Sequence, residues 1–208
     1  TASREAFDPK DRRTERMGNA RRTLMGAGLA TTYAAGQGVR SAYQRAKDFE
    51  FQGNLLEARA EYTRQERREI EAHAIKIANK YKFDVVEPMK AAVVMAQAGA
   101  KPAAAKAGME AGLVFGRFGD LPTTEATEGL VSIATAYGMA VETEADARKT
   151  YMTIADVIAK AANISKANPQ EVIKGVTNFA GLAKQLGVPL NLATAAVAAG
   201  VQAGEDGS

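Results

Sequence analysis

Apolar residues recur along much of the chain at the three- and four-residue spacing of amphipathic helices. Between residue 41 and about residue 80, the positions that carry this pattern are Tyr43, Phe49, Phe51, Leu55, Leu56, Ile70, Ala74, Ile77, Ala78 and Tyr81. Opposite charges four residues apart support a helix between Glu57 and Glu71. The pattern predicts continuous helix across this region, weakened at Gly53 but not broken there.

Capping residues, prolines and glycines divide the rest of the chain into further helices. Near the N-terminus, Asp8 and Pro9 predict the start of a short charged helix over residues 10–22. The cap Asn168, followed by Pro169, is the strongest start signal. Later helices should begin at Asp84, Pro102, Thr123 or Thr124, Thr143, Pro169 and near Pro189, and end at Gly99, Gly119, Gly138, near Asn163, at Gly187 and between Gly200 and Gly204.

Composition favours the same kind of fold. The 208 residues include 43 Ala, and alanine is the best helix former and a poor strand former. The run AAVVMAQA at residues 91–98 is apolar on every side, which predicts a buried helix. No run of alternating β-branched residues and no hairpin signal occurs in the sequence. We therefore predict an all-α fold of helical hairpins or a bundle, with about six to eight Ala-rich helices and turns marked by Gly and Pro.

Charge divides the chain unevenly. Residues 1–80 contain 16 Lys and Arg against 11 Asp and Glu, whereas residues 81–208 contain 11 against 13. This difference predicts a basic, Arg-rich N-terminal helical segment over residues 1–80 and a compact helical module over residues 81–208. We interpret the basic charge as the solvated faces of long helices, with a surface for an anionic partner as the alternative.

Two segments of the chain echo each other at residues 78–99 and 183–204. The identical pairs are Ala78 with Ala183, Ala91 with Ala196, Gln97 with Gln202, Ala98 with Ala203 and Gly99 with Gly204. Each segment predicts the end of one helix, a tight turn and a second helix closed by Gln-Ala-Gly. The echo is typical of a helical hairpin that is used twice.

Two stretches, residues 23–39 and 185–204, contain no charged residue. Both are rich in Gly, Ala, Thr and Gln, and are less apolar than membrane-spanning helices. In the first, Gly28, Thr32 and Gly36 would share one helix face that allows close packing. We interpret both stretches as buried packing segments, with membrane contact as the alternative.

Residues that usually carry chemistry are few. The chain has no Cys, which excludes disulfides and thiolate metal sites. His73 is the single His, and a metalloprotease helix would need a second His four residues away, so we interpret it as structural or solvated. The acids Glu142, Glu144 and Asp146 lie at a predicted helix start, where acids favour the helix dipole.

The remaining candidate motifs also have structural interpretations. The glycines of residues 26–38 follow no predicted strand and are not followed by the Lys of a phosphate loop. The glycines Gly112, Gly116 and Gly119 flank Phe115 and Phe118 and predict a tightly packed helix end. Arginine pairs such as Arg67 and Arg68 are typical of solvated helix faces, with phosphate contact as the alternative. We therefore predict no catalytic, cofactor-binding or metal-binding residue and expect that the protein is not an enzyme.

The order and spacing of several Ala- and Gly-rich segments resemble the core region of phage tail tape-measure proteins. The segments that carry the resemblance are residues 26–38, 46–50, 78–81, 95–99, 130–138, 159–172, 186–188 and 195–204. They include LVSIATAYG at residues 130–138 and AKAANISKANPQEV at residues 159–172. The first 20 residues carry no part of the resemblance.

The resemblance implies a structural role in a phage or prophage-derived tail. Tape-measure proteins occupy the lumen of the growing tail, set its length by their own and leave during DNA ejection. The implied partners are the tail tube, the tail tip or baseplate and tail assembly chaperones, and self-association stays open. The implied location is the virion, in the tail lumen or tip, and the host cytoplasm during assembly; no cofactor or small-molecule substrate is implied.

The chain begins at Thr1 and not at Met, so we expect it to be processed or to be a segment of a longer polypeptide. As one continuous helix, 208 residues would reach only about 310 Å. The segment is therefore expected to be a compact module of a longer tape. The alternatives are a membrane-active helical element of DNA ejection and a general helical module for protein interaction.

Overall fold

The computed structural model describes residues 40–204 and divides the chain into two units, Thr1–Lys47 and Asp48–Ser208. The described residues of the first unit, 40–47, are helical. The second unit begins with helical residues 48–60, and the helices that follow are α2 Arg64–Tyr81, α3 Val86–Gln97, α4 Pro102–Gly119, α5 Thr123–Tyr137, α6 Glu144–Ser165, α7 Pro169–Gln185 and α8 Leu190–Gln202. The helix predicted over residues 10–22 and the uncharged stretch 23–39 lie outside the described residues.

The all-α prediction is confirmed. Of the residues that the structure describes, 82% are helical, in eight helices, and none forms a strand. The division of the chain into residues 1–80 and 81–208, which rests on charge, stays a prediction. Helix α2, which spans that point, packs against α3 and α4 within the second unit.

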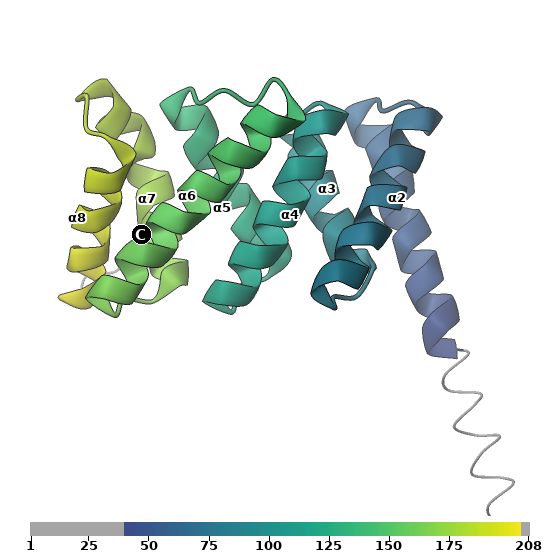
Figure 1. The fold of residues 1–208 in the computed structure, drawn as a ribbon, viewed down its shortest axis with the longest axis horizontal. Helices are drawn as coiled ribbons and strands as arrows, with labels where there is room; N and C mark the ends of the chain where they lie inside the picture. The colour runs from purple at the N-terminus through teal and green to yellow at the C-terminus, as the bar shows by residue number, and fades with distance from the viewer. Residues whose placement is uncertain (1–39, 205–208) are drawn as a thin grey trace, which may run out of the picture. The chain divides into compact units, whose positions relative to one another are not determined.

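The helices of the second unit form two layers, as Figure 1 shows. In one layer α2 packs against α4, α4 against α6, and α6 against α8. In the other layer α3 packs against α5, and α5 against α7. Consecutive helices connect the layers, so the unit is a stack of helical hairpins in which each helix contacts the next helix but one.

Helix α4 lies at the centre of this stack and depends on small residues. Because Gly112 has no side chain, α5 approaches so closely that an added Cβ would lie 2.0 Å from Thr127 Oγ1. At Gly108, an added Cβ would lie 2.3 Å from Met95 Sδ of α3. Phe115 of the same helix is buried. The predicted tight packing is therefore confirmed at Gly112, whereas Phe118 in the last turn of α4 is exposed.

Most helix boundaries follow the caps in the sequence. Helix α4 begins at Pro102 and ends at Gly119, as predicted. Thr143 caps α6 by accepting a hydrogen bond from the Asp146 backbone N–H at 3.1 Å, and Asn168 caps α7 in the same way. These caps act within one helical turn, so they do not depend on distant packing.

The continuous helix predicted from residue 41 to residue 80 is wrong, because residues 61–63 are not helical. Glu61 takes a left-handed conformation with φ of 57°. Thr63 then starts α2 with a reciprocal cap: its backbone N–H donates to Glu66 Oε2 at 2.8 Å, and its Oγ1 accepts from the Glu66 backbone N–H at 3.3 Å. The capping box starts a new helix here, although apolar residues continue at helical spacing on both sides of residues 61–63.

The echoed segments have the same backbone pattern in the structure. Lys82 and Gly187 occupy equivalent positions, and both are left-handed, with φ of 59° and 71°. In each turn, the backbone N–H of the following residue donates to the carbonyl of an equivalent alanine. Phe83 donates to Ala78 at 3.0 Å, and Val188 donates to Ala183 at 2.8 Å. The α2–α3 and α7–α8 hairpins therefore use the same turn.

Candidate functional site

Glu110 is the only charged residue that is buried among the described residues. It lies on α4, and its side chain is 3% exposed. Lys80 Nζ lies 2.9 Å from Glu110 Oε1, and the Tyr81 hydroxyl donates to the same oxygen at 2.5 Å. Arg148 of α6 donates to the second oxygen, Oε2. We call these four residues the Glu110 clamp, because they join α2, α4 and α6.

The electrostatics of the clamp favour an ionised Glu110. Burial is the largest single influence and by itself raises the pKa of this carboxyl. The hydrogen bonds from Tyr81, Lys80 and Arg148 together outweigh burial and lower the pKa of Glu110 to about 2. Glu110 therefore stays an anion at neutral pH, and its two cationic partners keep about half of their side-chain surface in solvent.

A second set of contacts continues the clamp toward the turn after α2. Arg117, in the last turn of α4, donates from Nη1 to the Tyr81 carbonyl at 2.8 Å. Its guanidinium also lies 3.9 Å from the centre of the Phe83 ring. Glu110 and Arg117 of α4 thus fix both the last residues of α2 and the turn that follows them. The arrangement holds helices together and leaves no oxygen of Glu110 without a partner from the chain.

The candidate residues from the sequence do not join this clamp. His73 lies on α2, and its Nε2 atom is buried without a hydrogen-bond partner among the described residues. Burial lowers the pKa of His73, and the nearby Glu144 and Glu110 only partly oppose this shift. No group of three or more His, Cys, Asp or Glu residues that could hold a metal ion occurs within residues 40–204.

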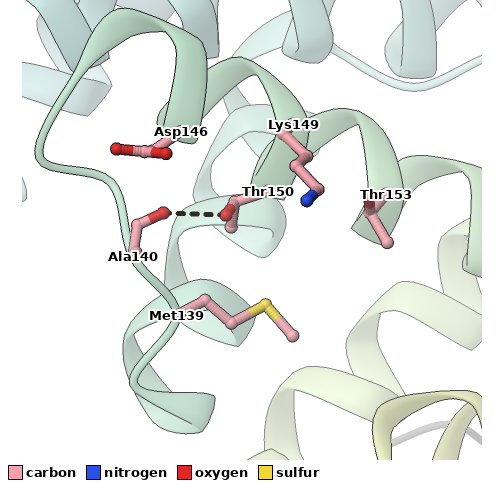
Figure 2. Close-up of a pocket in the computed structure, with 6 residues that line it drawn as sticks. All are labelled: Met139, Ala140, Asp146, Lys149, Thr150 and Thr153. Atoms are coloured by element: carbon pink, nitrogen blue, oxygen red, sulfur yellow. Dashed lines mark hydrogen bonds between the residues drawn. The ribbon is translucent and has the colours of Figure 1, made fainter.

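One shallow hollow lies where the turn after α5 meets α6, shown in Figure 2. It has a volume of about 350 Å³, and the residues that line it are Met139, Ala140, Asp146, Lys149, Thr150 and Thr153. The Thr150 hydroxyl donates to the Ala140 carbonyl at 2.8 Å, so it is already satisfied. Met139 lies across the hollow from the side chains of α6 (Figure 2). The hollow offers a contact surface without a convergent set of reactive groups.

A second hollow of about 360 Å³ is polar and lies beside the start of α2. Its lining consists of Asn54, Glu57, Arg64, Arg67, Arg68 and Glu71. Arg67 donates from Nε to Glu71 at 2.7 Å and from Nη1 to Asn54 at 2.6 Å. Arg67 also pairs with Glu57 at 3.3 Å. The pair Arg67 and Arg68 is therefore not one basic surface, because Arg67 is used to join residues 48–60 to α2.

The uncharged stretch 185–204 forms the turn after α7 and the short helix α8. Within residues 40–204, no helix is both long enough and apolar enough to cross a membrane. The stretch 23–39, for which membrane contact was also an alternative, lies outside the residues that the structure describes.

The family model described as phage-related minor tail protein matches residues 71–208, from the middle of α2 through α8. No curated protein and no solved structure matches the chain.

Proposed function

Because the chain belongs to the family of phage-related minor tail proteins, with a structural role in the tail, we propose that it forms part of a tape-measure protein. In this role it would help to set the length of a phage tail and would leave the tail during DNA ejection. The family match over residues 71–208 is the observation that supports the proposal most directly. The order of Ala- and Gly-rich segments, which resembles the core region of tape-measure proteins, supports the assignment to a tape-measure protein in particular.

The geometry supports a compact part of the tape and not an extended one. Among helices α2 to α8 the longest, α6, has 22 residues and therefore spans about 33 Å. The close approaches at Gly108 and Gly112 and the Glu110 clamp hold the helices side by side. Stacked in this way, the chain adds far less length than the same number of residues in one helix. We propose that other parts of the tape supply most of the length.

The proposed role is not enzymatic. Glu110, the most deeply buried acid of the described residues, has every oxygen paired with side chains of its own chain, which suits a structural anion better than a general acid. The proposed partners are the tail tube, the tail tip or baseplate and the tail assembly chaperones. The proposed location is the tail lumen or tip of the virion, and the host cytoplasm during assembly.

The test is a series of in-frame deletions in the phage, with tail length measured by electron microscopy. Deletions in extended helical parts of the tape should shorten the tail by up to about 1.5 Å per residue. Deletion of the α3–α4 hairpin should instead abolish assembly, because it removes the centre of the stack. The variant His73→Ala is the control and should leave tail length and assembly unchanged.

Two results would overturn the proposal. Tails of unchanged length after large deletions elsewhere in the tape would exclude a measuring role. Loss of assembly in a correctly folded His73→Ala variant would show that a single polar side chain is essential, which a length-determining role does not require.

A further inference from the structure

The polar hollow beside the start of α2 contains two arginines whose side chains no other described residue engages. Arg64 and Arg68 line this hollow of about 360 Å³, and both are exposed. Within residues 40–204, neither side chain forms an ion pair or a hydrogen bond. They lie four residues apart on one helix, so they project from the same side of α2. We call these two residues the Arg64–Arg68 pair.

The acids of the hollow do not neutralise the Arg64–Arg68 pair, because both are engaged by Arg67. Arg67 Nε lies 2.7 Å from Glu71 Oε1, and Arg67 Nη1 lies 3.3 Å from Glu57 Oε1. These three side chains are at most 33% exposed, so they form a packed wall of the hollow. The lining contains three arginines and two acids. Its excess positive charge therefore belongs to the Arg64–Arg68 pair.

The start of α2 is an unfavourable place for two cations that have no counter-charge. Like charges four residues apart on a helix repel each other and lower its stability. Arg64 is the first residue of α2, and the start of a helix carries a positive potential that favours anions. The potential of the helix and the repulsion within the pair therefore act in the same direction. An anion held between the two guanidiniums would relieve both.

We propose that the Arg64–Arg68 pair binds a phosphate group. Each guanidinium carries N–H donors in a fixed plane that match two phosphate oxygens. Phosphate oxygens point in different directions, so two guanidiniums can approach one phosphate, whereas a single planar guanidinium satisfies a carboxylate. Two sources share this chemistry, the backbone of a nucleic acid and a free phosphate compound. The inference does not rest on the tape-measure role.

The first test measures binding of a fluorescein-labelled single-stranded oligodeoxynucleotide to the complete chain by fluorescence anisotropy, and binding of pyrophosphate by calorimetry. The double variant Arg64→Gln and Arg68→Gln should raise the dissociation constant of the tighter probe at least about tenfold. For the oligonucleotide, the slope of the logarithm of affinity against the logarithm of salt concentration should become shallower by about 1.4, because each contact to a single strand contributes about 0.7.

The matched control removes the same net charge at a distance from the hollow. It is the double variant Lys160→Gln and Lys184→Gln, at exposed positions of α6 and α7. Salt screens charges that are far from the ligand, so this control should change the dissociation constant by less than about twofold. Circular dichroism should show equal helicity in the wild-type chain and both double variants, because all four substituted side chains are exposed.

The relative affinity of the two probes identifies the source of the phosphate. Tighter binding of the oligonucleotide would indicate a nucleic-acid backbone, and tighter binding of pyrophosphate would indicate a free phosphate compound. A wild-type chain that binds neither probe would overturn the proposal. So would equal weakening by the two double variants. An oligoglutamate that binds as tightly as the tighter probe would also overturn it, because the pair would then accept any anion.

Discussion

In the α2–α3 hairpin Ala91 is completely buried, whereas its equivalent in the α7–α8 hairpin, Ala196, is exposed. The two hairpins nevertheless share the same left-handed turn and the same closing hydrogen bond. The Glu110 clamp also ties α2 to α4 and α6, whereas no buried carboxylate occurs in α7 or α8. The comparison shows that the turn is set locally, while the stability of each hairpin depends on its neighbours in the stack.

The largest expected difference in stability between the hairpins follows from removing the two cationic partners of Glu110. The double variant Lys80→Met and Arg148→Met leaves a buried carboxylate with Tyr81 as its remaining partner, which should give the largest loss in the free energy of unfolding. Chemical denaturation measures this loss. The control is Lys174→Met on α7, which removes a half-exposed partner of Glu125. It should lower the free energy of unfolding by less than about 1 kcal/mol. Equal losses would contradict a special role for the clamp.

Acid should weaken the clamp. The pKa of Glu110 is about 2 in the folded chain, below its ordinary value of 4.5, so the folded state binds fewer protons than the unfolded state between these values. The stability that Glu110 contributes is therefore complete above about pH 4.5 and lost as the pH falls to about 2. Glu110→Gln should have a shallower decline of melting temperature over this range. Parallel curves for the two proteins would contradict the lowered pKa.

Overpacking should distinguish the two echoed alanines. Ala91→Leu adds volume to a completely buried position of α3 and should cost about 1–3 kcal/mol, and Ala96→Leu should behave similarly. Ala196→Leu adds volume at an exposed position and should change the free energy of unfolding by less than about 0.5 kcal/mol. Melting temperatures of dilute samples provide the measurement. A large loss of stability in Ala196→Leu alone would contradict the expected difference between the two positions.

The smallest expected effects are at the shared turn, and they have opposite signs. Lys82→Gly relieves a left-handed conformation at a non-glycine residue and should stabilise the chain by about 0.5 kcal/mol. Gly187→Ala introduces the same strain in the equivalent turn and should destabilise by about 1 kcal/mol. Nothing lies within 4 Å of an added Cβ at Gly187, so the cost is conformational and not steric. Effects of the same sign would show that the turns are not equivalent.

Much of the fold could be predicted from the sequence, because the main signals act locally. Pro102, Thr143 and Asn168 each mark the start of a helix through contacts within one turn. The run at residues 91–98 predicts a buried helix because it is apolar on every side; Ala91 and Ala96 are buried, but Gln97 and Ala98 at its end are exposed. The break before Thr63 was missed because its partner Glu66 also belongs to a run of alternating charges, where acids and bases support a helix equally well.

The Glu110 clamp could not be predicted, because its members come from three helices. Glu110 lies 30 residues from Lys80 and 38 residues from Arg148, so no local spacing relates them. One signal was present: Glu110 is the single acid of α4, among small and apolar residues. A lone charge in such a helix must find a partner in the core. Which partner it finds depends on how the helices stack, and the sequence pattern does not contain that information.

Because the helices are stacked one after another, the module should unfold in a fixed order when its C-terminal end is pulled. Tension on the C-terminal end would first peel away α8, which packs against α6 and α7, and then α7. The 17 residues of α7 and the 13 of α8 would release roughly 100 Å of extended chain. The Glu110 clamp would resist at the centre of the stack, where three helices must separate together. Pulled from its C-terminus, the module would lengthen in steps of single helices before its centre yields.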